Sequence, residues 1–458
     1  MIEQILRIIK KVIPAKIFGI IQPVYHFCLA YLGALIYGFP SKKMFIVGVT
    51  GTKGKSTTSY LIAQLLNFAG IKTGMATTVL FKIGEKEWIN SSKQTMLGRF
   101  QLQRLLAKMV KEGCKYVVVE TSSEGILQYR HTFIDYNAAV FTNLSPEHIE
   151  HHGSFENYRG AKVKLFEKIA KKAPTLVNRG SDRSVGKNSV GIYNLDDANV
   201  GCFLKPKVLN QYVFTSNLKL SGSSIGNLYQ IVKIKSNSNG TTFSLSVGAG
   251  RREEIKMPLI GKFNVYNAVA AICFALSQGI EMSEIKKIMT QIKPPPGRLE
   301  LIKTGKFSIV VDYAHEPASL ETVYKGIIES KIKSSKGEMI CLFGSQGGGR
   351  DKWKRQAMGR VAAEYCDKII LTNEDSYDEP PIEIINQVNE GIISNEKKSK
   401  KLVVYKIIDR EEAIKKAISL AGKGDTVVLT GKGGEVWMCI ENGKKIPWDE
   451  RKIVEGLL

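Results

Sequence analysis

The chain lacks features that would assign it to several common classes of protein. Its seven cysteines are widely spaced and form no CxxC pair, so the sequence favours neither a zinc site nor a disulfide framework. An odd number of cysteines in a chain of 458 residues is typical of a reducing cytoplasm. No short repeat of fixed period occurs, and no small-residue cleavage site follows the first apolar stretch, as a secretory signal would require. We therefore expect a cytoplasmic protein.

Acidic residues are scarce beside basic ones: 43 Asp and Glu face 66 Lys and Arg, a formal net charge of +23. Such an excess suits acidic ligands, including nucleotides and sugar nucleotides, and it also suits an anionic membrane surface. No stripe of Lys and Arg with interleaved aromatic residues stands out, so we expect no nucleic-acid partner. The length predicts two or three domains with large cores.

The N-terminal segment, residues 1–43, has an uneven distribution of charge. Residues 17–41 contain no Asp, Glu, Lys or Arg, whereas Lys10, Lys11 and Lys16 precede them and Lys42 and Lys43 follow. A stretch of this length is close to what a bilayer requires, but a proline and several polar residues interrupt it. Two interpretations stay open, a helix packed on protein and a peripheral contact with a membrane, and we favour packing on protein.

A glycine-rich turn between a strand and a helix is the strongest signal in the chain. Residues 44–49 are apolar and β-branched, as in a buried strand, and residues 58–69 have apolar side chains at helical spacing. Between them, N–H groups of the turn and of the helix start would face an anion. The predicted phosphate loop is Gly51, Thr52, Lys53, Gly54, Lys55, Ser56 and Thr57.

Two later strands predict further groups beside this loop. Residues 116–120 form a buried strand that ends on Glu120, and residues 138–143 form another that precedes His148. Ligands of open α/β sheets collect at such carboxyl ends, so Glu120 is well placed to hold a magnesium ion. The alternative for Glu120 is the N-cap of the next helix. Neighbouring His and Glu side chains make a metal or phosphate role for His148 more plausible.

The proline run at residues 294–296 is the best linker in the chain. Before it, residues 157–172 predict a lysine-rich helix, residues 174–256 alternate short strands and turns, and residues 262–279 predict a long apolar helix. Beyond it, strands and helices alternate to residue 430, which predicts a second α/β unit with a mainly parallel sheet. The predicted domains are residues 1–43, 44–297 and 298–458.

Taken together, these motifs resemble those of the Mur ligase family, and most closely its tripeptide synthetase branch. The shared stretches are residues 51–57, 120–125, 128–130, 142–148, 158–162, 261–267, 297–300, 312–315, 347–355 and 431–435. The resemblance covers residues 44–458 and implies an α/β fold. It implies a central P-loop ATPase domain with a parallel sheet and a C-terminal Rossmann-like α/β domain. The family's N-terminal UDP-binding domain would be reduced to a short helical segment.

The resemblance implies an ATP-dependent acid–amino-acid ligase that forms ADP and works through an acyl phosphate in peptidoglycan precursor synthesis. ATP would meet the phosphate loop together with Asn267, Arg298, Asp312 and His315. The catalytic residues would be Lys55, His148 and Lys162, and the magnesium ligands would be Ser56, Glu120, His148 and Lys162. Lys162 would act as a carbamate formed with carbon dioxide. Its alternative is an ordinary lysine on a basic helix.

The resemblance also implies two substrates, a UDP-N-acetylmuramoyl-dipeptide and an amino acid. The muramyl peptide would be held by Thr95, Ser123, Gln128 and Arg130, and the amino acid by Arg350, Gly431 and Glu435. The family's Asp-Asn-Pro-Arg motif, whose arginine meets diaminopimelate, corresponds here to Glu374, Asp375, Ser376 and Tyr377. Two acids without an arginine favour a diamino acid with a cationic side chain, such as lysine or ornithine. We expect a monomer.

Two other classes of function stay open. One is a different amide ligase of the same superfamily, of the folylpolyglutamate, cyanophycin or lipid-linked muramyl type. The other is a binding module that holds nucleotide without catalysis. The presence of Lys55, Glu120, His148 and Lys162 together argues against the second class.

Overall fold

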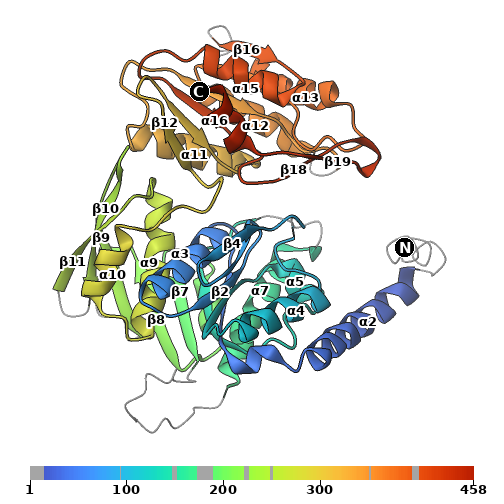
Figure 1. Ribbon diagram of the computed structural model, residues 1–458, viewed down its shortest axis with the longest axis vertical. Coiled ribbons are helices and arrows are strands. Elements are labelled where there is room, and N and C mark those ends of the chain that lie inside the picture. The colour runs from blue at the N-terminus through green and yellow to red at the C-terminus, as the bar shows by residue number, and fades with distance from the viewer. Residues whose placement is uncertain are drawn as a thin grey trace. The chain divides into compact units, whose positions relative to one another are not determined.

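The structure is a computed structural model that describes residues 15–92, 94–146, 152–172, 189–220, 226–247, 251–349, 352–394 and 402–458, with backbone alone for 15–21. The chain separates into two compact units. Unit 1 comprises Met1–Val232, Leu245–Glu253 and Tyr266–Ile288, and unit 2 comprises Lys233–Ser244, Glu254–Val265 and Met289–Leu458. The elements of both are labelled in Figure 1.

The larger sheet has 11 strands in the order β11-β10-β9-β8-β7-β6-β1-β5-β2-β3-β4. The strands from β9 to β2 pair in parallel, whereas β3 pairs with β2 and with β4 in antiparallel fashion. The predicted α/β class is therefore confirmed, with a mixed sheet in place of a purely parallel one. The strands are β1 (Phe45–Thr50), β2 (Thr73–Ala76), β3 (Leu80–Ile83), β4 (Lys86–Ile89), β5 (Tyr116–Glu120), β6 (Tyr136–Phe141), β7 (Val190–Asn194), β8 (Asn210–Thr215), β9 (Asn227–Asn237), β10 (Gly240–Val247) and β11 (Arg251–Met257).

Helices cover this sheet and complete its core. They are α3 (Lys55–Phe68), α4 (Arg99–Lys111), α5 (Ser123–Leu127), α7 (Phe155–Ala170), α8 (Val200–Leu204), η2 (Leu218–Leu220), α9 (Lys262–Ser277) and α10 (Met282–Met289). Every residue of β1 is buried, as its apolar run predicts, and the buried face of α3 packs on β1, β2 and β5. Burial of each large aliphatic side chain contributes roughly 1.5–3 kcal/mol, so this packing fixes the turn between β1 and α3.

The first described elements of unit 1 are helix α2 (Ala15–Ile36) and the short helix η1 (Pro40–Lys43). The side of α2 that packs on α4 carries small residues, Ala30, Gly33 and Ala34, which are buried. A side chain added at Gly33 would meet the backbone of Phe100 at 3.4 Å, so glycine permits the close approach of the two helices. Among the described residues, no helix has both the length and the apolar character needed to cross a bilayer.

Unit 2 contains a sheet of six strands in the order β12-β13-β17-β14-β15-β16, parallel except for the β12–β13 pair. Its strands are β12 (Glu300–Lys303), β13 (Ser308–Val311), β14 (Met339–Phe343), β15 (Lys368–Leu371), β16 (Val403–Lys406) and β17 (Thr426–Leu429), beside the hairpin β18 (Trp437–Cys439) and β19 (Lys445–Pro447). Its helices are α11 (Pro317–Glu329), α12 (Trp353–Tyr365), α13 (Pro381–Ile393), α15 (Arg410–Ser419), η3 (Glu441–Gly443) and α16 (Glu450–Leu457). The predicted alternation is confirmed, whereas β12, β18, β19 and α16 were not expected.

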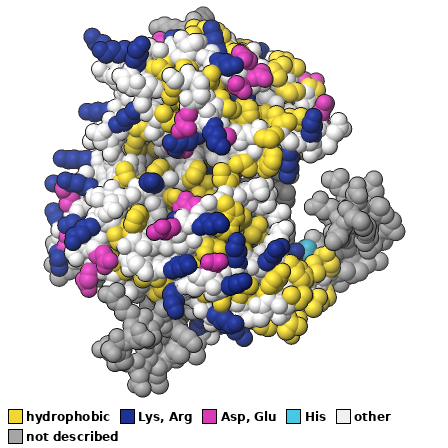
Figure 2. All heavy atoms as spheres, viewed as in Figure 1, with side chains coloured by type: hydrophobic (Ala, Val, Ile, Leu, Met, Phe, Trp, Pro, Cys, Tyr) yellow, Lys and Arg dark blue, Asp and Glu magenta, His cyan; other side chains and the backbone are white. Residues whose placement is uncertain are grey.

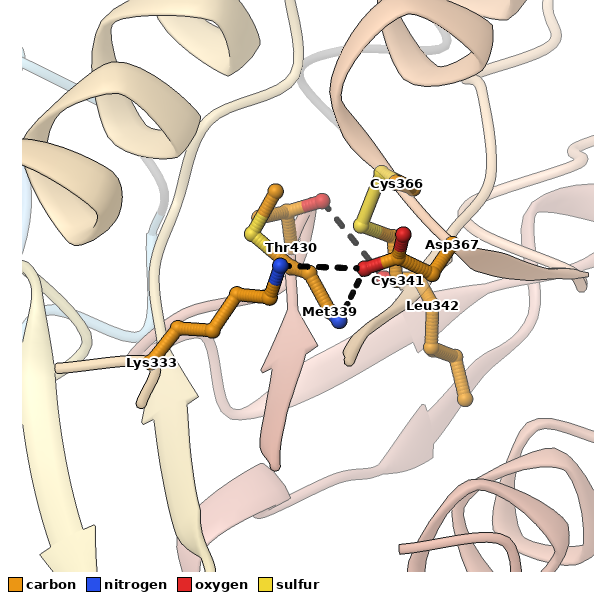
Figure 3. Close-up of a disulfide and its surroundings, with 7 residues drawn as sticks. All are labelled: Lys333, Met339, Cys341, Leu342, Cys366, Asp367 and Thr430. Carbon is orange, nitrogen blue, oxygen red and sulfur yellow. Dashed lines mark hydrogen bonds and ion pairs between the residues drawn. A yellow bond between two sulfur atoms is a disulfide. The ribbon is translucent and has the colours of Figure 1, made fainter. Parts of the chain in front are cut away.

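One expectation about cysteine is wrong: Cys341 and Cys366 form a disulfide (Figure 3). Cys341 lies in β14, and Cys366 directly follows α12, two residues before β15. Strand β15 pairs with β14 in parallel, so the two cysteines come close together. The carboxylate of Asp367, the next residue, accepts a hydrogen bond from the N–H of Met339 at 2.7 Å. It also forms an ion pair with Lys333 at 3.4 Å. The two cysteines are 25 residues apart, so their spacing gave no sign of the pair.

Candidate active site

The turn between β1 and α3 has the backbone of a phosphate loop. Gly51 and Gly54 have φ angles of 148° and 79°, and a side chain at either position would collide with a neighbour. At Gly54 an added Cβ would lie 2.2 Å from Oδ1 of Asn267. Gly54 caps α3 without a side chain, so no capping side chain occupies the first N–H groups of the helix, which could bind an anion. Lys55 is the first residue of that helix, and its Nζ donates to the carbonyl of Thr52 at 2.7 Å.

The segment after β6 holds the loop in this conformation. Thr142 donates from Oγ1 to the carbonyl of Lys53 at 2.7 Å, and Asn143 accepts from the N–H of Lys53 at 2.9 Å. The Thr52 hydroxyl accepts from the N–H of Ser145 at 3.0 Å. Residues about 90 positions away in the sequence therefore hold the loop in this conformation. No such role was predicted for Asn143.

Ser56 and Glu120 meet at the carboxyl ends of β1 and β5, as the magnesium prediction requires. The Ser56 hydroxyl donates to Oε2 of Glu120 at 2.8 Å, and the same oxygen accepts from the N–H of Thr78 at 2.8 Å. Glu120 is buried. The alternative role as an N-cap is wrong, because Ser122 caps α5 and accepts from the N–H of Gly125. A hydroxyl and a carboxylate side by side are hard oxygen donors that suit Mg²⁺.

Lys162 lies beneath the phosphate loop. It is 2% exposed, its Nζ donates to the carbonyl of Gly51 at 2.7 Å, and the same atom lies 4.5 Å from the centroid of the Tyr158 ring. The alternative of an ordinary surface lysine is therefore wrong. Helical spacing places Lys162 with Tyr158, Ala161 and Leu165 on the buried face of α7, a signal that was present in the sequence.

Asn267, near the start of α9, contacts the loop from another direction. Its Oδ1 accepts from the Thr58 hydroxyl at 3.3 Å, and the side chain is buried. The position agrees with the predicted role at the nucleotide, which stays a prediction. His148 and Arg350 lie outside the described residues. Among the described residues, no group of three or more His, Cys, Asp or Glu side chains could hold a metal ion.

The four residues predicted to hold the muramyl peptide lie near the Ser56–Glu120 pair or connect to one another. Thr95 accepts a hydrogen bond from the hydroxyl of Thr78, and the N–H of Thr78 donates to Glu120. Thr78 therefore links Thr95 to the Glu120 carboxylate. Arg130 donates from Nη2 to Oε1 of Gln128 at 2.7 Å and from Nη1 to the carbonyl of Met96. Burial lowers the pKa of the Arg130 guanidinium.

Ser123, the fourth of these residues, binds a histidine that the sequence analysis left without a role. Its Oγ lies 3.1 Å from Nε2 of His152, which is buried against the ring of Tyr158. Tyr158 also contacts Thr52 of the loop at 3.1 Å. Through these contacts Ser123 is linked to the phosphate loop.

In unit 2, Arg298, Asp312 and His315 gather at the end of β13. The two carboxylate oxygens of Asp312 accept from the N–H groups of Leu299 at 2.6 Å and Ala314 at 2.7 Å. Burial raises the pKa of Asp312, and the Arg298 guanidinium counteracts this effect. Arg298 stacks over the ring of Tyr313 at 4.5 Å. Asp312 therefore fixes the backbone on which Arg298 and His315 are presented.

The carboxyl ends of β15 and β17 bring Glu374, Asp375, Gly431 and Glu435 together in unit 2, whereas Arg350 lies outside the described residues. Lys432 is buried between acids: its Nζ donates to Asp375 at 2.9 Å and to Glu435 at 2.6 Å. Glu435 also accepts from the hydroxyl of Tyr313 at 3.1 Å. Sequence reasoning missed Lys432. The expected negative pocket is therefore partly neutralised, because the charge of Asp375 is already compensated.

Glu374 is the exception among these acids. It is 1% exposed, and in the part of the chain that the structure describes neither of its carboxylate oxygens has a hydrogen-bond partner. Its Oε2 lies beside Gly431, where an added Cβ would approach it to 2.2 Å. Burial raises the pKa of Glu374 from 4.5 to about 7, despite the nearby cations Arg410, Lys354 and Lys432. A buried carboxylate without a hydrogen-bond partner is rare, which makes Glu374 a candidate for binding a cationic group.

Comparisons with known proteins agree with this arrangement. Residues 49–275 match the Mur ligase middle domain, and residues 297–433 match the Mur ligase glutamate ligase domain. The chain is 35% identical over 431 residues to UDP-N-acetylmuramoyl-L-alanyl-D-glutamate–2,6-diaminopimelate ligase of Syntrophomonas wolfei, which covers 94% of this chain and 81% of the relative. It is 36% identical over 446 residues to UDP-N-acetylmuramyl-tripeptide synthetase of Treponema denticola, covering 94% and 79%.

Solved structures show the same fold. One, a UDP-N-acetylmuramoyl-L-alanyl-D-glutamate–2,6-diaminopimelate ligase, superposes with a TM-score of 0.60 at 29% identity, covering 90% of this chain and 78% of that one. Folylpolyglutamate synthase of Mycobacterium tuberculosis, complexed with ADP, superposes with a TM-score of 0.67 at 17% identity, covering 88% and 91%. The second likeness shows the fold alone. From the two domain matches and the curated relatives, the chain belongs to the Mur ligase family and is an ATP-dependent acid–amino-acid ligase.

Proposed function

We propose that this protein adds a diamino acid to a UDP-N-acetylmuramoyl-dipeptide during synthesis of peptidoglycan precursors. The observation that carries the proposal is the convergence of Lys55, Ser56, Glu120 and the buried Lys162 around one phosphate loop, in a chain whose relatives bear names of this activity. We propose that it works in the cytoplasm as a monomer.

The reaction would begin with transfer of the γ-phosphoryl group of ATP to the carboxylate of the dipeptide. The products of this step are ADP and an acyl phosphate. The N–H groups at the start of α3 and the charge of Lys55 would stabilise the transferring phosphoryl group. The amine of the incoming amino acid would then attack the acyl carbon, phosphate would leave, and the amine would lose a proton as the amide forms.

Magnesium fits the residues that are present, because Ser56 and Glu120 offer adjacent oxygen donors at the loop. When bound, the ion would neutralise phosphate charge. The further ligand His148 is proposed from the family likeness. Lys162 is proposed to lose a proton to solvent, attack carbon dioxide as the neutral amine and release a second proton, so that a buried cation becomes a carbamate anion. Its burial beside Gly51 supports a role at the phosphates, and intact-protein mass spectrometry in bicarbonate buffer would detect the added carbon dioxide.

For the identity of the amino acid, we propose lysine or ornithine in preference to meso-diaminopimelate. Glu374 supplies a buried carboxylate whose oxygens would pair with a side-chain ammonium, and such a charge-assisted contact would be short and strong. Tyr377 stands where the family motif has the arginine that meets the second carboxylate of diaminopimelate. The diaminopimelate ligase names of several relatives favour the other substrate, so both amino acids must be compared directly.

The test is ADP release and mass spectrometry of the product, with UDP-muramoyl-Ala-Glu, ATP, magnesium and equal amounts of lysine, ornithine and meso-diaminopimelate. We expect the lysine or ornithine product to dominate. Dominance of the diaminopimelate product would reverse our choice of amino acid but leave the ligase assignment intact. No ADP release with any of these amino acids would instead favour a ligase of the folylpolyglutamate, cyanophycin or lipid-linked type.

A substitution tests whether Glu374 binds the side-chain ammonium of the amino acid. Glu374→Gln should raise the KM for lysine by tenfold or more, because the lost pair is charge-assisted and buried, while the KM for ATP stays the same. Glu383→Gln, at an exposed position on α13, is the matched control and should leave both constants unchanged. Equal lysine constants in the two variants would remove Glu374 from the pocket.

A further inference from the structure

Helix α2 differs from an ordinary amphipathic surface helix, which turns its large apolar residues toward the protein core. Its small residues face the protein, as described above, and its large apolar residues face outward. The exposed fraction of these side chains runs from 40% for Tyr25 to 65% for Ile36. The apolar face of α2 consists of Val24, Tyr25, Phe27, Tyr31, Leu32, Leu35 and Ile36. Figure 2 shows it as a continuous hydrophobic band.

Helical periodicity makes these residues one surface. Val24, Phe27, Tyr31 and Leu35 follow one another at spacings of three and four, so their side chains lie along a single stripe. The rings of Phe27 and Tyr31 each rest with one edge on Phe133, at centroid distances of 5.2 and 5.4 Å. Most of the stripe nevertheless stays open in the described structure. A contiguous apolar surface of this kind marks a site of interaction.

The surroundings of this face are basic. Helices α2, η1 and α4, which pack as one group, contain no Asp or Glu. They contain exposed Lys42, Lys43 and Arg104. In the neighbouring loop, the carboxylate of Asp135 is paired with Lys172 at 2.9 Å. The charged side chains of the three helices that carry and support the apolar face are therefore all basic.

We propose that the apolar face of α2 binds the surface of an anionic lipid bilayer. The opposite side of the helix is packed on α4, so only the outward face enters the boundary between headgroups and acyl chains. Aromatic residues such as Tyr25 and Tyr31 are enriched at that depth, and Lys42 and Lys43 would contact anionic headgroups. A partner protein would need an acidic rim to match the same surface, and a second copy of this chain would place equal charges against each other.

The test uses Cys28, which is exposed on α2 beside Val24 and Leu32, whereas Cys202 is half-buried and the other free thiols are buried. In a Cys202→Ser background, an environment-sensitive fluorophore on Cys28 of the full chain is titrated with vesicles. We expect a blue shift with vesicles that contain phosphatidylglycerol, a weaker response with phosphatidylcholine alone, and reversal by salt. Sedimentation of the unlabelled protein with the same vesicles provides an independent measurement.

Two variants separate the apolar and the charged contributions. Lys42→Gln with Lys43→Gln should weaken binding about 25-fold, since each lysine near such a surface contributes about fivefold. Leu32→Ser, Leu35→Ser and Ile36→Ser together should weaken it by at least tenfold. All these positions are exposed, so thermal unfolding should be unchanged. The matched control is Ile328→Ser with Ile393→Ser, exposed apolar positions in unit 2 that should leave binding as it is.

Absence of binding to anionic vesicles would overturn the proposal, as would equal binding by all variants. Concentration-dependent self-association that the serine variants abolish, without vesicle binding, would assign the face to a second copy of the chain. The measurement needs no ligase activity, so its result is independent of the proposed reaction.

Discussion

Replacing Glu374 by Gln should stabilise the protein at alkaline pH even though it harms use of the amino acid. The carboxyl is buried, has no hydrogen-bond partner in the described structure, and has a pKa raised from 4.5 to about 7. A raised pKa means that the folded state disfavours the charged form. Below pH 4.5 the group is protonated in both states and causes no penalty. As pH rises from 4.5 to about 7, the carboxyl ionises in the unfolded chain but not in the folded one, so the free energy of unfolding falls; above pH 7 it changes little further.

The magnitude follows from the difference between the two pKa values. Each pKa unit corresponds to about 1.4 kcal/mol, so ionised Glu374 lowers the free energy of unfolding by about 3 kcal/mol at pH 8. Glutamine cannot ionise and removes this penalty. Any constant cost of placing an amide in the site is the same at every pH. The informative quantity is therefore the change with pH of the difference between variant and wild type.

The assay is denaturant unfolding of both proteins between pH 5 and pH 8, read through the fluorescence of the tryptophans. The stability difference should shift by about 2.5 kcal/mol in favour of the variant across this range, mostly between pH 5 and 7. Saturating lysine should reduce the shift, because an ammonium beside Glu374 would stabilise its charged form. A stability difference that does not vary with pH would show that Glu374 titrates normally, and the argument from its burial would fail.

Three further predictions concern the phosphate loop and the core. Lys55→Ala should reduce turnover by about 10²–10³-fold with an unchanged melting temperature, because the lysine supplies charge to phosphates; near-normal turnover would refute the loop assignment. Lys162→Ala should lose activity that formate or bicarbonate partly restores, whereas exposed Lys164→Ala on the same helix should behave as wild type; equal activities in the two variants would leave Lys162 without a chemical role. Glu450→Ala should lower the free energy of unfolding by about 3–5 kcal/mol, measured with denaturant, because it leaves the fully buried charge of Arg410 without its carboxylate partner. A decrease below 1 kcal/mol would contradict this.

The residues of the candidate site whose positions in the fold could be predicted from sequence are those set by local structure. The phosphate loop needs only a strand, two glycines and a helix start, which are adjacent in the chain. Glu120 was placed correctly because residues at the carboxyl ends of neighbouring parallel strands lie close together. Lys162 was recognised only through family likeness, although the period of α7 already placed it on the buried face.

The parts that sequence could not predict depend on contacts between distant residues. Glu374 and Asp375 are adjacent acids with no local difference between them, yet Asp375 is neutralised by Lys432, 57 residues away, and Glu374 is not. The support of the phosphate loop by Asn143 likewise requires knowledge of which strands become neighbours. Such pairings follow from the order of strands in the sheet, which hydrophobic periodicity does not encode.

The disulfide between Cys341 and Cys366 changes how this protein should be handled in the laboratory. It closes a loop of 25 residues that carries the chain from β14 through the turn after it and α12 to β15. That turn leads toward the strand ends where Glu374 and Gly431 lie in unit 2. Both cysteines are buried, so dithiothreitol reaches this bond mainly in the unfolded chain. Refolding with and without reductant therefore starts from two different chains, and refolding yields should be compared only between matched buffers.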